Sequence, residues 1–146
     1  GGIRASGTGS LTITGSTIAA NTDTGAGGGL FLLNNTTTVS NSTISGNTTN
    51  NSTLGGGGVY TSGSVTLNNV TLADNKANGL GAVSFGFGAA APHGTFFNTI
   101  IAQGGGGTAG NCLNVTGGVG DALADTRALP SDVFDYGFDP ADVSPF

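Results

Sequence analysis

Short stretches of the chain alternate between apolar and polar residues. Residues 11–14 read LTIT, residues 59–62 read VYTS and residues 65–68 read VTLN. Alternation with a period of two places apolar side chains on one face of a β-strand and polar ones on the other. Gly and Asn, which favour bends, separate these stretches, and no segment shows the apolar stripe of a helix. The pattern predicts an all-β protein built from short strands.

One heptapeptide recurs along the chain. It reads GSTIAAN at 15–21, NSTISGN at 41–47, NVTLADN at 69–75 and, in degraded form, NTIIAQG at 98–104. Its fourth residue forms an apolar column at intervals of 26, 28 and 29 residues, which we expect to face the core: Ile18, Ile44, Leu72 and Ile101. A second column lies five residues earlier: Ile13, Val39, Leu67 and Phe96. A third column follows glycines: Ile3, Leu30, Val59 and Val83.

Each unit therefore carries three short strands separated by turns, and it cannot bury its apolar face alone. Stacking on similar neighbours buries that face. The repeats over residues 1–116 predict a parallel β-solenoid (β-helix) of about four coils, with the right-handed sense of parallel crossovers. Residues 117–146 are expected to form an irregular C-terminal tail that packs on the solenoid or on a neighbouring subunit.

Asparagine recurs at both ends of the heptapeptide. We expect two rows at different corners of the coils, one of Asn21, Asn47 and Asn75, the other of Asn41, Asn69 and Asn98. Asparagine tolerates left-handed backbone and hydrogen-bonds its own turn, and stacked amides can bond one another. We expect both rows to be structural ladders; a ligand-binding row is the alternative.

The units resemble the right-handed parallel β-helix repeats of bacterial surface proteins of the choice-of-anchor type. They are also similar to the repeats of polymorphic outer-membrane proteins, whose GGAI and FxxN motifs are matched in part by GGGL at 27–30 and FLLN at 31–34. The segments NTIIAQ at 98–103 and GNC at 110–112 resemble the last coil of the first group. The resemblance covers residues 1–116 and implies the fold more than the function, because such helices host adhesins, lyases and plain stalks.

Charge is sparse and uneven. Only 8% of the residues are charged, and the charges within residues 1–120 cancel, so the whole net charge of −5 lies in residues 121–146. Nucleic acid and anionic lipid both require clustered Lys and Arg, so neither is an expected partner. No stretch approaches the length of a membrane span, and no signal peptide is recognised.

The sequence offers few residues that could form a catalytic or metal-binding site. Carbohydrate-active β-helices resemble one another in needing grouped carboxylates, or Ca²⁺ together with a basic residue. The coils of this chain offer only two carboxylates, Asp23 and Asp74, with Lys76 close to Asp74 in the sequence. His93 is expected to be a neutral turn residue. Cys112 is expected to be a buried thiol near the end of the solenoid, with an intermolecular crosslink as the alternative. We therefore expect no enzyme, no cofactor and no metal site.

We do not expect a calcium site in the C-terminal tail. Residues 117–125 read GGVGDALAD, which is similar to a calcium-binding nonapeptide, but the motif occurs once and its Asp stands one position early. The tail also mixes acidic and aromatic side chains, and the aromatic ones favour a segment that docks on a surface.

An interface is expected where aromatic residues line up. If Leu30 and Val59 point inward, then Phe31 and Tyr60 point outward at matching places. Coverage of these rings by the tail or by a loop of the same chain is the alternative. Because Gly1 begins directly inside the first coil, we expect either that the chain was cut from a longer solenoid or that another molecule covers that edge. The candidate interface residues are Ile3, Arg4, Phe31, Tyr60, Phe134, Tyr136, Phe138 and Phe146.

These observations favour an extracellular or cell-surface structural protein, a self-assembling β-solenoid subunit that stacks head-to-tail into a filament or stalk. Its expected partner is itself. The first alternative is a carbohydrate-binding adhesin module with Phe31 and Tyr60 as stacking platforms for a surface glycan. The second, less favoured, is a β-helix similar to the polysaccharide lyases and hydrolases.

Overall fold

The computed structural model describes residues 1–51, 53–78, 83–85, 94–103, 112–114 and 133–135. Within these residues every regular element is a β-strand and none is a helix. The strands are β1 (Ile3–Ser6), β2 (Ser10–Thr14), β3 (Thr17–Ala19), β4 (Thr22–Asp23), β5 (Leu30–Leu33), β6 (Thr36–Ser45), β7 (Thr48–Thr49), β8 (Val59–Thr61), β9 (Ser64–Ala77), β10 (Val83–Phe85), β11 (Gly94–Phe97), β12 (Thr99–Gln103), β13 (Cys112–Asn114) and β14 (Val133–Asp135).

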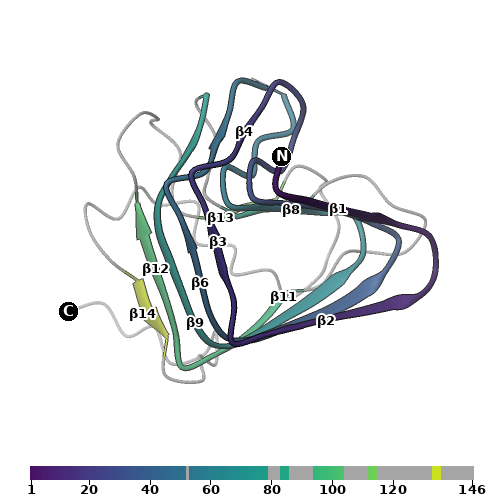
Figure 1. The fold of residues 1–146 in the computed structure, drawn as a ribbon, viewed down its shortest axis with the longest axis vertical. Helices are drawn as coiled ribbons and strands as arrows, with labels where there is room; N and C mark the ends of the chain where they lie inside the picture. Colours follow the sequence, from purple (N-terminus) through teal and green to yellow (C-terminus); the bar gives the residue numbers. More distant parts are fainter. Residues whose placement is uncertain (52, 79–82, 86–93, 104–111, 115–132, 136–146) are drawn as a thin grey trace.

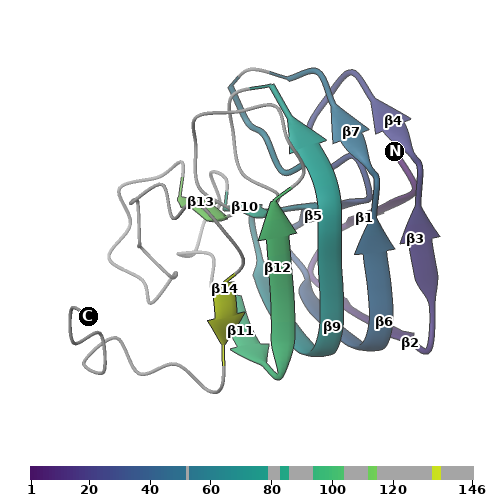
Figure 2. The same cartoon turned by 90° about the vertical axis from the view of Figure 1, so that its left-hand side faces the viewer.

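Consecutive coils place equivalent strands side by side. One sheet has the order β1-β5-β8-β10-β13, and the larger one runs β2-β6-β9-β12-β14, with β3 on β6 and β11 on β9. Every pairing is parallel except that of β14 with β12. Figure 1 shows the coils stacked behind one another, and Figure 2 shows β3, β6, β9 and β12 in a row. The predicted all-β parallel solenoid is confirmed, although it has about three turns and not the four coils that were predicted, and its right-handed sense stays a prediction.

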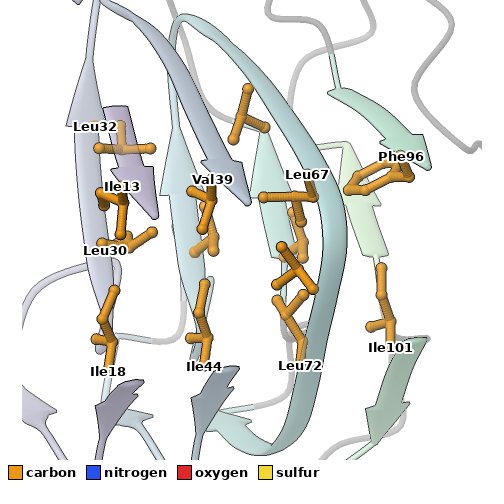
Figure 3. Packing of buried hydrophobic residues seen from close by; sticks show 14 residues of the cluster. Ile13, Ile18, Leu30, Leu32, Val39, Ile44, Leu67, Leu72, Phe96 and Ile101 are labelled. Atoms are coloured by element: carbon orange, nitrogen blue, oxygen red, sulfur yellow. The ribbon is translucent and has the colours of Figure 1, made fainter. Parts of the chain in front are cut away.

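The repeat columns form the core. Ile18 pairs with Ile44, Ile44 with Leu72 and Leu72 with Ile101 in the register of the larger sheet. All four are at most 6% exposed, and the columns that begin at Ile13 and Ile3 lie beside them. Figure 3 shows these side chains meeting inside the coils. The alternation in the sequence therefore identifies the inward face correctly.

Glycine runs allow each coil to close. A Cβ at Gly28 would lie 2.7 Å from the carbonyl oxygen of Thr48, and a Cβ at Gly57 would lie 2.5 Å from the backbone of Lys76. Real Cβ atoms do not approach backbone so closely, so the chain can pass its own coil here only as glycine. This explains why the strands β5 and β8 are preceded by glycine rather than by any other turn residue.

Candidate functional site

The row Asn21, Asn47 and Asn75 is a hydrogen-bonded amide ladder along the inside of one corner. The backbone N–H and the Nδ2 of Asn47 both donate to Oδ1 of Asn75, at 3.1 and 2.9 Å. Asn21 makes the same pair of bonds to Oδ1 of Asn47, at 3.0 and 2.9 Å. Asn47 is 0% exposed and Asn75 is 2% exposed. The amide of Asn47 thus bonds to the coil on either side of it.

The ladder also ties the side chains to the preceding coil. Nδ2 of Asn47 donates to the carbonyl oxygen of Ile18 at 2.9 Å, and Nδ2 of Asn75 donates to that of Ile44 at 2.8 Å. These carbonyls lie where the chain turns at the end of the core strand. The amides therefore bind carbonyl oxygens of the preceding coil and fix the corner against it.

The row Asn41, Asn69 and Asn98 has a different geometry. All three residues adopt left-handed backbone, with φ of 49°, 53° and 47°, and their side chains are exposed. Nδ2 of Asn69 donates to Oδ1 of Asn41 at 3.3 Å, on the surface. This corner therefore depends on the backbone tolerance of asparagine more than on its amide.

Hydroxyl residues support the left-handed corner, and the sequence reasoning missed them. At three of the four left-handed positions of this corner, the next residue donates its hydroxyl to the carbonyl two residues back: Ser16 to Thr14 at 2.9 Å, Ser42 to Ser40 at 2.7 Å and Thr99 to Phe97 at 2.9 Å. The signal was present as a Ser or Thr directly after the corner Gly or Asn in three of the four heptapeptides. Such local bonds stabilise turns.

The aromatic column is real, but Tyr60 is not exposed as predicted. The rings of Phe31 and Tyr60 stack, with centroids 5.3 Å apart and an interplanar angle of 10°, and the Arg4 guanidinium carbon lies 4.8 Å from the Phe31 centroid. Tyr60 is only 3% exposed. Its strand β8 lies between β5 and β10, so Phe31 covers one side of the ring and the next coil lies on the other. A glycan therefore cannot use Tyr60 as an open stacking platform.

The other proposed interface residues are placed unevenly. Ile3 is half-buried and packs against the core at the first coil. Phe134 lies in β14 opposite Ile100. Tyr136, Phe138 and Phe146 lie outside the described residues.

Of Cys112, His93 and the segment 117–125, only Cys112 falls in a described strand. It stands in β13, where its backbone is in register with Val83 of β10. His93 and the segment 117–125 lie outside the described residues.

The described charges do not assemble a reactive site. Asp23 accepts hydrogen bonds from the Gly1 amino group and from the backbone N–H of Gly25, and these lower the pKa of its carboxyl. Asp74 is exposed and takes the left-handed position of its corner, with φ of 55°. Among the residues that the structure describes, no three His, Cys, Asp or Glu side chains group closely enough to hold a metal ion.

Outward positions of the larger sheet carry hydroxyls. Thr12 pairs with Thr38, Thr38 with Thr66 and Thr66 with Thr95, one above the other. In the last of these coils, large apolar side chains appear outside instead: Phe97 is 47% exposed and Ile100 is 37% exposed. The outer surface near β12 therefore differs from that of the earlier coils.

Comparison of the chain with models of known protein families, with curated proteins and with solved structures gives no match. The β-solenoid repeat is shown, whereas no family match supports the resemblance to bacterial surface repeats. In the part of the chain that the structure describes, no helix is long and apolar enough to cross a membrane. Function is therefore inferred from the coil geometry.

Proposed function

We propose that the protein is an extracellular structural β-solenoid whose work is to extend by stacking coil on coil. The observation that carries this proposal is that the first coil presents the same surface that joins the inner coils. β1, β2 and β3 each pair on one side only among the described strands. No described strand pairs with their other side, and the backbone groups of a strand edge can template a further strand.

The direction of the free groups follows from the bonds that are made. The N–H of Ile3 donates to the carbonyl oxygen of Gly29, and the N–H of Thr36 donates to the carbonyl oxygen of Gly9. Gly29 and Thr36 belong to the second coil, whereas Ile3 and Gly9 belong to the first. In a parallel strand, the N–H and C=O of one residue face one neighbour and those of the next residue face the other. The backbone groups of Arg4 and Thr12 therefore point away from the second coil and are available to an incoming one.

Charge supports stacking at this edge. Arg4 is the only charged residue in the described strands β1, β2 and β3, and its guanidinium lies over Phe31. Edge strands that avoid association usually carry Lys, Pro or inward charges, and β2 and β3 carry none of these. The low charge of the coils and the resemblance to surface-protein repeats support an extracellular setting.

The two ends of the stack are unequal. β14 pairs antiparallel with β12, from Thr99 opposite Asp135 to Ile101 opposite Val133. A neighbour that docks its first coil on this end of the larger sheet has to displace these three pairs. Head-to-tail growth on this end of the larger sheet therefore requires release of β14.

The test is assembly of the protein as isolated. Sedimentation velocity over a range of concentrations, followed by cryo-electron microscopy, should show oligomers or filaments with the coil axis along the assembly. Thr12→Pro removes an N–H that points out of the solenoid and should prevent assembly while the monomer stays folded. Thr12→Val keeps the N–H and is the matched control. Monodisperse monomers at every concentration would overturn the proposal.

A further inference from the structure

The strand β14 differs from the other described strands in its direction. Their pairings are all parallel, as between equivalent strands of stacked coils, whereas β14 runs antiparallel to β12. Figure 2 shows the arrows of β12 and β14 side by side and pointing in opposite directions. β14 therefore lies where a strand of a following coil would pair with β12, but it is not a coil strand itself.

The bonds inside the larger sheet fix the direction of the backbone groups in β9. Gly46, which follows β6, donates its N–H to the carbonyl oxygen of Ala73. Because the N–H and C=O of one residue point to the same side of a strand, the backbone groups of Ala73 face β6. Those of the preceding residue, Leu72, therefore face β12.

The same alternation in β12 shows which backbone groups remain for β14. Leu72 stands opposite Ile101 in the register. In a parallel pair, a residue bonds the two neighbours of its register partner, so Leu72 meets the backbone groups of Ile100 and Ala102. The N–H and C=O of Thr99 and Ile101 therefore face away from β9, on the side where β14 lies.

The register of β14 matches these groups. Asp135 stands opposite Thr99, and Val133 stands opposite Ile101, so the backbone groups of Asp135 and Val133 face β12. Those of Phe134, between them, point to the outer side of β14. β14 thus replaces the edge of β12 with a much shorter one, and very short edge strands limit further pairing.

We propose that β14 is a releasable cap on the edge of β12 and that its release controls the pairing of a further coil there. The proposal rests on the stacking function and names how that function is regulated. A parallel strand that pairs with β12 requires the backbone groups of Thr99 and Ile101, which β14 already faces. The two strands cannot occupy this edge together, so assembly at β12 competes with β14.

The extent of the pairing makes β14 easier to release than a coil strand. β14 is joined to β12 by three residue pairs, whereas β6 and β9 are joined by nine. Segments with few backbone pairings open at a lower free energy than the central strands of a sheet. The cap can therefore open while the coils stay folded.

Proline substitutions in β14 test the cap without any assembly. Asp135→Pro removes an N–H that faces β12, whereas Phe134→Pro removes one that points away and is the matched control. Asp135→Asn controls for the loss of charge. The readout is hydrogen exchange of the backbone amides of Thr99 and Ile101 by NMR in the full chain, with the Leu72 amide as the internal reference for the coils.

We expect Asp135→Pro to accelerate exchange at Thr99 and Ile101 by about ten-fold or more, while the Leu72 amide stays slow. Both β12 amides should exchange as in the wild type in Phe134→Pro and in Asp135→Asn. Equal exchange at Thr99 and Ile101 in the two proline variants would overturn the cap. This result does not depend on self-association.

Assembly provides the second arm. In sedimentation velocity at matched concentrations, Asp135→Pro should form larger oligomers than the wild type and Phe134→Pro. Equal assembly of all three proteins would overturn the control by β14 and leave the stacking function intact. If none of them assembles although Asp135→Pro opens the β12 edge, the stacking function fails, and the exchange data still establish β14 as the cap of that edge.

Discussion

The two asparagine rows lie three residues on either side of the same core column, yet they act in opposite ways. Asn41 and Asn69 are exposed and hold left-handed backbone, with one amide–amide bond of 3.3 Å on the surface. Asn47 and Asn75 are buried, and their amides make bonds of 2.8–3.1 Å to neighbouring coils. At this second corner, the left-handed residues are instead Ala20, Gly46 and Asp74, one position earlier.

The difference shows that one residue type can be selected by its backbone at one corner and by its side chain at another. At the exposed corner, Gly15 takes the equivalent position with φ of 57°, which only requires tolerance of that conformation. At the buried corner, the three described positions all carry asparagine, whose amide supplies donors and acceptors. Burial alone does not decide the contribution of a polar group; its hydrogen-bond partners do.

The largest expected effect comes from the core column between the rows. Ile44 is 0% exposed, and Ile44→Asp would place an unpaired charge among Ile18, Leu72 and their neighbours. We expect a loss of about 5 kcal/mol in the free energy of unfolding, enough to unfold a domain of this size. Circular dichroism and thermal melting should show the loss of both corners together. An unchanged melting curve would mean that this column does not face the core.

Replacing one asparagine of each row with glycine tests whether the buried and the exposed row differ in their contribution to stability. Asn47→Gly removes an amide that serves Asn21, Asn75 and the carbonyl of Ile18. We expect a loss of about 4 kcal/mol, because several buried groups lose their partners. Chemical denaturation measures it.

Asn69→Gly is the matched control. Glycine accepts a φ of 53° without strain, so the unfolding free energy should change by less than about 0.5 kcal/mol. Equal losses for Asn47→Gly and Asn69→Gly would show that the two rows do not differ as their geometry indicates.

The backbone explanation of the exposed row makes a separate prediction. Asn69→Val places a β-branched residue at positive φ, and we expect a loss of about 2 kcal/mol although the side chain is exposed. Thermal melting against Asn69→Gly isolates the backbone term. If valine and glycine are equally tolerated, the conformation at this corner is not the constraint.

A substitution at Thr37 separates the effect of burial from that of hydrogen bonding. Thr37 is 0% exposed like Asn47, but its Oγ1 has no hydrogen-bond partner, and it lies between Leu11 and Val65 in the register. Thr37→Val keeps the shape and removes the unpaired hydroxyl, so we expect a gain of about 1 kcal/mol in stability. Denaturant midpoints should move upward. A downward shift would mean that the hydroxyl is satisfied in solution.

Much of the fold could be predicted from the residues because each coil repeats the last. The intervals of the heptapeptide placed Ile18, Ile44 and Leu72 in one column before any coordinates, and the strand registers agree. The sequence indicated that Gly28 and Gly57 separate strands. It did not show that the backbone of the neighbouring turn approaches them too closely for a Cβ atom. The number of turns was harder to predict, because the pattern weakens after Ala77.

The candidate site was less predictable. The sequence indicated that Phe31 and Tyr60 share an outward column, and the rings do stack. Their exposure could not be read from alternation, since the accessible surface of Tyr60 depends on what lies on either side of its strand. The hydroxyls of Ser42 and Thr99 were overlooked because Ser and Thr are frequent throughout the chain and their bonds depend on the left-handed residue before them.

The sequence by itself determined the all-β class, the stacking of the repeats and the inward columns. It could do so because a parallel solenoid places each residue against its own equivalent, so a local pattern repeats as a global contact. Only the tertiary structure decided which asparagine row is buried and whether Tyr60 is covered. Both depend on where the backbone turns within each corner, and a one-residue difference there moves an amide from the surface to the interior.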